Sequence, residues 1–135
     1  MKYSFTCYGH PNITALHKNT LEFTKDDFVT KRGDCIVGCR ADFELEEIKK
    51  LIASAQKQPC EVKITLKSNP LAETLQGTLN PEFEDDHEIV IRKGGFCSKR
   101  TMVILADRAS SDLSEAFRAA LKLAETRIDI IIETI

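Results

Sequence analysis

Two histidines share one polar segment near the start of the chain. His10 and His17 lie within residues 9–19, and the opening Gly-His-Pro-Asn of that segment favours a loop. Histidine serves as a general acid or base because its ordinary pKa lies closest to neutrality. We therefore predict that His10 and His17 are candidate catalytic residues. The alternative is that each ring only fixes the loop through hydrogen bonds to backbone carbonyls.

No metal centre is expected at this segment. Zinc needs three or four ligands at suitable spacing, and the chain has neither a Cys-x-x-Cys pair nor a His-Glu-x-x-His helix. If a metal were bound, His10, His17 and Cys35 would be its ligands. The chain also lacks a phosphate-binding Walker loop and a dinucleotide-binding glycine motif, so the sequence leaves the cofactor unassigned.

A second polar group precedes an apolar segment at Thr-Lys-Arg-Gly-Asp-Cys, residues 30–35. A loop held by a rigid strand is a common position for a site, so Arg32 is a candidate anion ligand and Asp34 a candidate catalytic acid. Cys35 could be a nucleophile if a neighbouring cation lowered the pKa of its thiol. The favoured interpretation of Cys35 is a buried core thiol, because free cysteine is among the most buried residue types.

A third polar group contains four cations within residues 92–100, and Glu88 is the only carboxylate between residues 88 and 106. Glycines beside cations can expose backbone N–H groups to a phosphate or carboxylate. We predict a ligand-binding role for this group. Its members are Arg92, Lys93, Arg100 and Thr101, with Asp107 facing the same pocket. The alternative is a solvated hairpin tip.

The elements that must position these groups follow from hydrophobic periodicity. Alternating apolar and polar residues predict strands at 2–8, 21–24, 60–67, 73–79 and 88–92, and apolar runs predict strands at 35–39, 101–106 and 127–134. Apolar residues at three- and four-residue spacing predict helices at about 44–57 and 110–125. Asp42 is the expected cap of the first helix, and Ser110 or Ser111 that of the second. About eight strands and two helices indicate an α+β or mainly-β sandwich.

The composition describes one globular domain. The chain has 135 residues, of which 42% are hydrophobic and 30% charged, so residues 1–135 can bury a core of their own. We expect a cytoplasmic protein without a membrane segment, because there is neither a signal peptide nor a sufficiently long apolar stretch. Five cysteines, an odd number, favour reduced thiols.

The net charge of −2 conceals an uneven distribution. Residues 1–40 carry 6 basic and 4 acidic groups, residues 41–90 carry 5 and 11, and residues 91–135 carry 8 and 6, which gives +2, −6 and +2. The total excludes a broadly basic nucleic-acid binder. The candidate residues lie almost entirely in the two mildly basic ends.

Several motifs occur together along nearly the whole chain. They are Gly9-His10-Pro11-Asn12, His17-Lys18 with Thr20, Glu22 and Thr24-Lys25, Arg32-Gly33-Asp34-Cys35-Ile36 with Gly38, Ala41-Asp42, Arg92-Lys93, Arg100-Thr101 and Ala106-Asp107-Arg108-Ala109. In combination they resemble the archaeal family called domain of unknown function 371. The resemblance implies a single-domain, jelly-roll-like antiparallel β-sandwich and supplies no function.

The chain departs from the expected family pattern at two places. Arg108-Ala109-Ser110 stands where a lysine and two alanines are expected, which preserves the charge but removes an amine that can be deprotonated. Cys39 stands where an aliphatic residue is expected, which fits a core position and argues against metal ligation there.

These residues lead to one functional hypothesis and two alternatives. We expect loops 9–20, 31–35 and 92–108 to form a pocket for a small anionic, phosphate-like ligand, with Arg32 and Arg100 holding the anion. One histidine would act as acid or base, oriented by Asp34 or Glu22. The alternatives are an RNA- or protein-binding module that uses hairpin 92–100 with Phe96 as a stacking surface, or a structural subunit of an oligomer. Nucleic acid is the less favoured partner, and whether the protein is an enzyme is left open.

Overall fold

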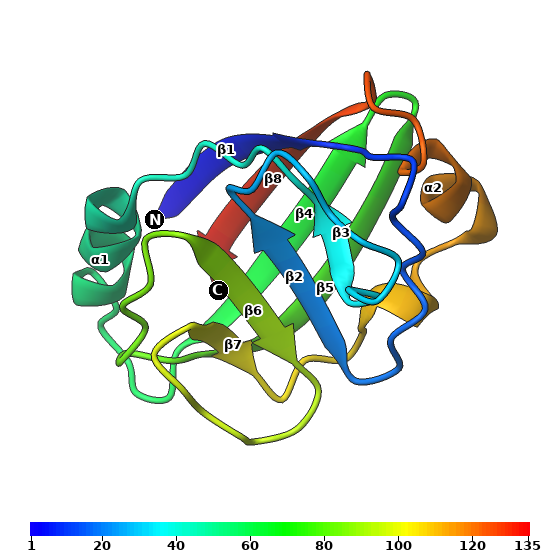
Figure 1. Ribbon diagram of the computed structural model, residues 1–135. Coiled ribbons are helices and arrows are strands. Elements are labelled where there is room, and N and C mark those ends of the chain that lie inside the picture. The colour runs from blue at the N-terminus through cyan, green and yellow to red at the C-terminus, as the bar shows by residue number, and fades with distance from the viewer.

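The computed structural model describes all 135 residues and contains one mixed eight-stranded sheet with two short helices (Figure 1). The strands are β1 (Lys2–Tyr8), β2 (Thr20–Thr24), β3 (Ile36–Gly38), β4 (Glu61–Ser68), β5 (Leu71–Leu79), β6 (Glu88–Arg92), β7 (Thr101–Ile104) and β8 (Arg127–Thr134). The expected mainly-β class, strand number and strand positions are confirmed. The sheet differs from the expected antiparallel one because β2 pairs with β3, and β6 with β7, in parallel.

The sheet curls until its two edge strands meet. Its strand order is β1-β8-β4-β5-β7-β6-β2-β3. Tyr8 at the end of β1 and Cys39 after β3 exchange two backbone hydrogen bonds of 2.8 Å, so the edges are joined at one point. In Figure 1 the strands β2 and β6 consequently cross in front of β4, β5 and β8. Joining the edges satisfies backbone groups that would otherwise remain unpaired.

The core fills the space enclosed by the curled sheet. Its strands alternate as the sequence predicts, with inward apolar residues such as Phe5 on β1 and Phe23 on β2. The ring of Phe5 meets those of Phe23 and Phe43 edge-on, each at 5.6 Å between centroids. Burial of such rings is the main favourable contribution to folding.

Both helices are shorter than predicted, and neither uses the expected cap. Helix α1 (Leu45–Ala53) begins after Glu44. Asp42 does not cap it, because the Asp42 carboxylate accepts the Thr6 backbone N–H at 2.7 Å. The helix buries Ile48 and Leu51 and ends where the Ser54 hydroxyl bonds the Leu51 carbonyl. None of the helices in the protein is long and apolar enough to span a membrane.

The predicted second helix is divided into two pieces. A 3-10 turn covers Ser110–Asp112, and α2 covers Glu115–Ala120 with Ser114 as its cap, which accepts the Phe117 N–H at 3.1 Å. Ser110 is completely buried, and its hydroxyl lies 2.9 Å from the Thr20 carbonyl and 2.7 Å from the Cys35 carbonyl. The serine expected to cap a helix therefore ties the start of β2 to the start of β3.

Candidate functional site

The outward face of β2 is buried although it carries polar side chains. Strand alternation sends Leu21 and Phe23 into the core and places Thr20, Glu22 and Thr24 on the opposite face. All three polar residues are buried, and Glu22 is only 7% exposed. An acidic side chain is almost never buried unless it is paired, so the neighbours of Glu22 define the candidate site.

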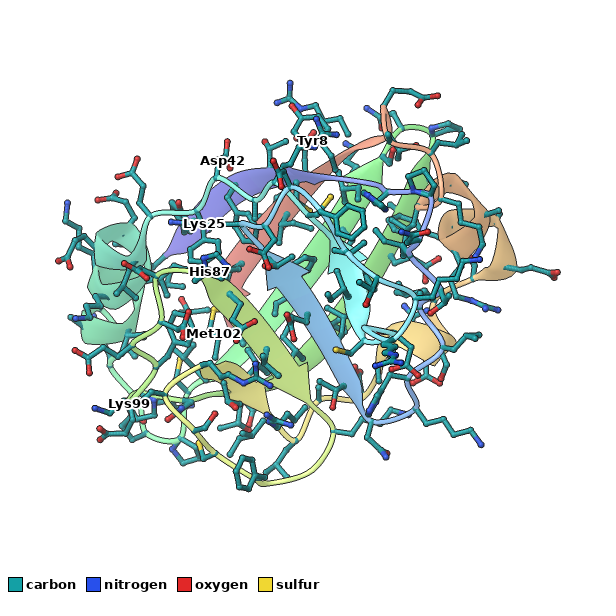
Figure 2. The ribbon with its side chains drawn as sticks, in the orientation of Figure 1. Tyr8, Lys25, Asp42, His87, Lys99 and Met102 are labelled. Carbon is teal, nitrogen blue, oxygen red and sulfur yellow. The ribbon has the colours of Figure 1, made fainter.

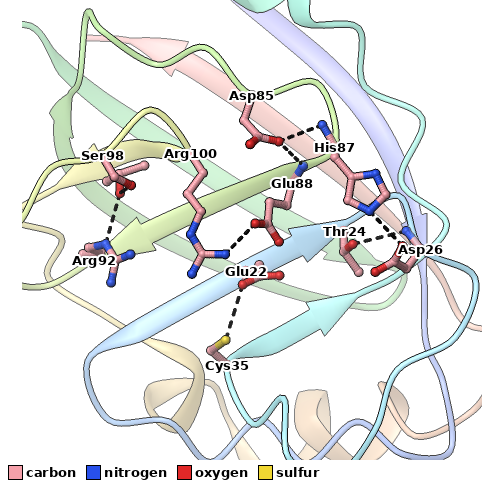
Figure 3. Close-up of polar contacts among 11 residues, drawn as sticks. Glu22, Thr24, Asp26, Cys35, Asp85, His87, Glu88, Arg92, Ser98 and Arg100 are labelled. Atoms are coloured by element: carbon pink, nitrogen blue, oxygen red, sulfur yellow. Dashed lines mark hydrogen bonds and ion pairs between the residues drawn. The ribbon is translucent and has the colours of Figure 1, made fainter.

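Three neighbouring segments supply those partners (Figure 3). Strand β6 brings Glu88, the residue before β7 is Arg100, and the residue before β3 is Cys35. The Arg100 guanidinium donates from Nη1 to Glu88 Oε1 at 2.5 Å, and the Cys35 thiol donates to Glu22 Oε1 at 3.6 Å. These four side chains, Glu22, Cys35, Glu88 and Arg100, are called the acid–arginine cluster below.

Within the acid–arginine cluster, Glu22 is the carboxyl group whose pKa is shifted towards neutrality. Burial raises the pKa of Glu22 to about 7, and a hydrogen bond to Glu88 together with the negative charge of Glu88 adds to the effect, while Arg100 opposes it. A hydrogen bond between two carboxyl groups requires one of them to be protonated. Glu22 therefore gains or loses its proton in the range where acid–base chemistry operates in cells.

The two arginines on this face keep donors without a protein acceptor. Arg92 lies on the same face of β6 as Glu88, and its Nε donates to Thr101 Oγ1 at 3.0 Å. Its Nη1 and Nη2 have no protein acceptor, nor have Nε and Nη2 of Arg100. A guanidinium group carries five N–H donors in a planar fork that matches carboxylate and phosphate oxygens. The face can therefore offer several donors to an anion.

Cys35 is not an activated nucleophile in this arrangement. Burial, followed by the charge of Glu22 and the hydrogen bond to it, raises the pKa of the Cys35 thiol to about 12. The thiolate is the reactive form, so at neutral pH this sulfur stays protonated and donates to the carboxylate. Cys35 is nevertheless half-buried and lies outside the hydrophobic core, so the expectation of a buried core thiol is wrong, and its sulfur contacts an acid.

Thiol reactivity provides a direct check. Of the five free cysteines, only Cys97 is exposed, whereas Cys7, Cys39 and Cys60 are buried and Cys35 is half-buried. We expect Ellman's reagent to titrate one thiol rapidly in the native protein, and Cys97→Ser to remove that phase. A rapid phase that survives Cys97→Ser and disappears in Cys35→Ser would contradict this assignment and indicate a thiolate at Cys35.

The loops of His17, Asp34 and Lys93 come together at the Thr20 end of β2. The Asp34 carbonyl accepts the backbone N–H groups of Leu16 and His17, and the Asn19 carbonyl accepts that of Lys93. The His17 ring accepts at Nδ1 from the N–H groups of Asn19 and Thr20 at 3.1 and 3.0 Å. His17 thus braces its loop as the alternative interpretation expects. Its partners, however, are backbone N–H groups in place of the expected carbonyls.

His10 lies in a different place. Its ring Nδ1 accepts the Asn12 N–H at 3.0 Å and its edge packs against Phe28. It lines an open hollow of about 610 Å³, with Arg40 among the other lining residues. The hollow lies near the seam, the point at which Tyr8 of β1 pairs with Cys39 after β3. No contact joins His10 to Arg100, so the structure separates two residues that the sequence hypothesis combined in one pocket.

The other predicted ligand residues fall into three environments. Arg32 is exposed and has no hydrogen bond or ion pair with the rest of the protein. Thr101 is completely buried and accepts from Arg92. Asp107 is exposed and its carboxylate accepts the Gln76 N–H at 3.0 Å, which fixes the chain to β5. Arg92, Thr101 and Arg100 share the face of the acid–arginine cluster, whereas Arg32 and Asp107 make no contact with it.

Most cations of segment 92–100 are paired with carboxylates, which the sequence does not indicate. Carboxylates that are distant in sequence neutralise three of them, in the pairs Lys93–Asp112 at 2.6 Å, Lys99–Glu84 at 3.9 Å and Arg100–Glu88. Lys99 extends outward at the edge of the molecule that lies opposite Tyr8 and Asp42 (Figure 2). Arg92 has no carboxylate partner, and its guanidinium lies 5.0 Å from the centre of the exposed Phe96 ring.

The metal alternative finds no support in the geometry. No group of three or more His, Cys, Asp and Glu side chains is arranged to hold a metal ion. His10 and His17 both use Nδ1 to accept from their own loops, and Cys35 contacts Glu22. The three residues named as ligands therefore have separate partners.

Sequence reasoning missed the acidic half of the cluster. It treated Glu22 only as a group that could orient a histidine, and Glu88 only as a counter-charge for the cations. One signal was present, because Glu22 stands at the centre of Thr-Leu-Glu-Phe-Thr, where an acid replaces the small polar residue that a half-buried strand usually shows. The proximity of Glu22 to Glu88 depends on strand register. Glu22 lies opposite Val90 and Thr24 opposite Glu88, so Glu22 and Glu88 are diagonal neighbours on one face.

Fold and site together define a single-domain, mainly-β protein with a curled mixed sheet and an acid–arginine cluster on its outer face. The chain belongs to the family described as domain of unknown function DUF371, whose model matches residues 5–135. It is similar to "Uncharacterized protein MJ0206" of Methanocaldococcus jannaschii, with 31% identity over 128 residues that cover 90% of this chain and 92% of that protein. The resemblance recognised from the sequence motifs is therefore confirmed.

Proposed function

We propose that the outer face of β2, β6 and β7 binds a small anionic ligand that carries a phosphate or carboxylate group, with Arg92 and Arg100 as its cationic partners. The observation that carries the proposal is the set of guanidinium donors on this face that have no protein acceptor. The proposal keeps the anion site expected from the sequence and keeps Arg100 as one of its cations. Arg92 replaces Arg32 as the other.

The surroundings of the two arginines support this assignment. The Arg100 side chain is 46% exposed, whereas its partner Glu88 is 21% exposed, so solvent reaches the guanidinium more readily than the carboxylate. Arg92 is held by a hydrogen bond to buried Thr101 and by the Phe96 ring. A guanidinium that is already held in place loses little conformational entropy when an anion binds, so the entropic cost of binding is lower.

Calorimetric titration tests the proposal with sulfate, inorganic phosphate and oxalate as probes. We expect at least one of them to bind saturably, and Arg92→Gln or Arg100→Gln to weaken binding at least about tenfold, since a charge-assisted hydrogen bond contributes about 1.5–3 kcal/mol. The matched control is Arg127→Gln, which removes the same charge from β8, where Arg127 pairs with Asp129.

Two outcomes would overturn the proposed function. One is that none of the three anions binds saturably in the millimolar range. The other is that Arg127→Gln weakens binding as much as the two site variants, because a loss of that kind reflects the overall charge of the protein.

A further inference from the structure

We infer that the acid–arginine cluster takes up a proton together with its anion, so that Glu22 and Glu88 form the proton-binding half of the site. The inference rests on the proposed function and adds to it the co-ligand and the direction in which pH controls binding. Its basis is that Arg100 is the counter-charge of the carboxyl pair and also the group that an anion would engage.

The first step concerns the free protein. Glu88 keeps one of its oxygens on Arg100, and buried Glu22 is its diagonal neighbour on the same face of β2 and β6. One proton on Glu22 removes the repulsion between the two carboxylates. With that proton in place, the charges of Glu22, Glu88 and Arg100 sum to zero. Without it, two neighbouring carboxylates are charged, one of them buried, and the one cation paired with them is Arg100, on Glu88.

The second step concerns the bound state. An anion that accepts from Arg100 shares or replaces the hydrogen bond to Glu88 and brings a negative charge beside the pair. Both changes weaken the compensation of the carboxylates, so the pair holds its proton more strongly. Thermodynamic linkage makes the effect reciprocal, and protonation of the pair must strengthen anion binding by the same factor.

The groups around Glu22 act on its protonation in opposite directions. Burial and the charge of Glu88 from β6 favour protonation of Glu22, whereas Arg100 and the hydrogen bond from Cys35 oppose it. Cys35 donates its thiol hydrogen to the carboxylate form of Glu22 and stays neutral near pH 7. An anion at Arg100 cancels the cation that opposes protonation and leaves burial and the charge of Glu88, so we expect affinity to fall as the pH rises through neutrality.

The experiment counts protons during binding. Sulfate and oxalate do not themselves titrate near neutral pH, so calorimetry in buffers of different ionisation enthalpy measures protons taken up by the protein. We expect a substantial fraction of one proton per anion near neutral pH, and about a tenfold loss of affinity for each unit of pH above the transition, the limit for one linked proton. In Glu22→Gln, which cannot ionise and imitates the protonated carboxyl group, the proton uptake and the pH dependence should both disappear.

The outcomes separate this inference from the proposed function. Saturable binding that depends on Arg100 but takes up no proton would overturn the inference and leave the anion site intact. Absence of saturable binding would overturn both. The control Glu73→Gln removes the carboxylate partner of a different arginine, Arg108, and should keep the proton count of the wild type. A loss of proton uptake in that control would also contradict the assignment to Glu22 and Glu88.

Discussion

Gly9→Ala is expected to destabilise the protein by about 3 kcal/mol, because overpacking a rigid contact costs this much. A Cβ atom at this position would lie 2.3 Å from the Leu123 carbonyl oxygen and 2.5 Å from that of Leu121. Both obstacles are backbone atoms, so no side-chain rotation relieves the clash. Gly9 also donates its N–H to Thr126 at 3.0 Å, and its carbonyl faces the Cys39 thiol, so a shift would disturb the seam where β1 meets β3.

Gly94→Ala is the matched control for this substitution. A Cβ atom at Gly94 would meet nothing within 4 Å, so we expect stability to change by no more than about 0.5 kcal/mol. Urea unfolding followed by circular dichroism measures both variants. Equal stability of Gly9→Ala and Gly94→Ala would show that the close approach of Gly9 to residues 121–123 does not hold the fold, and it would contradict this view of the seam.

Glu22→Gln is expected to make the protein more stable than the wild type above neutral pH, by about 2–3 kcal/mol. The pKa of Glu22 rises from 4.5 to about 7 on folding, with burial as the largest cause. Each unit of pKa shift corresponds to about 1.4 kcal/mol, and partial contact of the pair with solvent reduces the total. Glutamine keeps the shape of the side chain and avoids the cost of burying its charge.

The direction of the pH effect follows from where the proton is held. Below pH 4.5 the Glu22 carboxyl is protonated in both folded and unfolded chains, so its contribution is fully present. Between 4.5 and about 7 the folded protein keeps a proton that the unfolded chain releases, and the free energy of unfolding falls as the pH rises. Urea unfolding at several pH values in this window should give curves for wild type and Glu22→Gln that diverge as the pH rises. Parallel curves would contradict the burial of an ionisable Glu22.

The sequence predicts the strands well because their signal is local. Alternation at residues 2–8 and 60–67 corresponds to β1 and β4 within a residue or two, since one face of each strand is buried. The caps are predicted wrongly, because Asp42 and Ser110 satisfy backbone groups far away in sequence. The contact between Tyr8 and Cys39 joins strands at opposite ends of the sheet order, and no local pattern indicates it.

The sequence predicts only part of the candidate site, because local patterns do not show which strands are neighbours. The residue types of His17, Arg92 and Arg100 mark them as candidates, and the structure places His17 beside the start of β2, Arg92 at the end of β6 and Arg100 just before β7. The proximity of Glu22 to Glu88 comes from the antiparallel register of those strands, which a single sequence does not specify. The neutralisation of Lys93 by Asp112 likewise depends on the fold, so a count of charges along the chain overestimates the positive charge of segment 92–100.

The most direct test of the anion site observes the arginine side chains themselves. Arginine side-chain N–H signals can be followed by nuclear magnetic resonance during a sulfate titration slightly below neutral pH, with Arg92→Gln and Arg100→Gln used to assign the two signals. We expect saturable shifts for Arg92 and Arg100 and none for Arg127, which pairs with Asp129 on β8. Equal, non-saturating drifts of all arginine signals would show only a response to ionic strength and would contradict a binding site on the face of β2, β6 and β7.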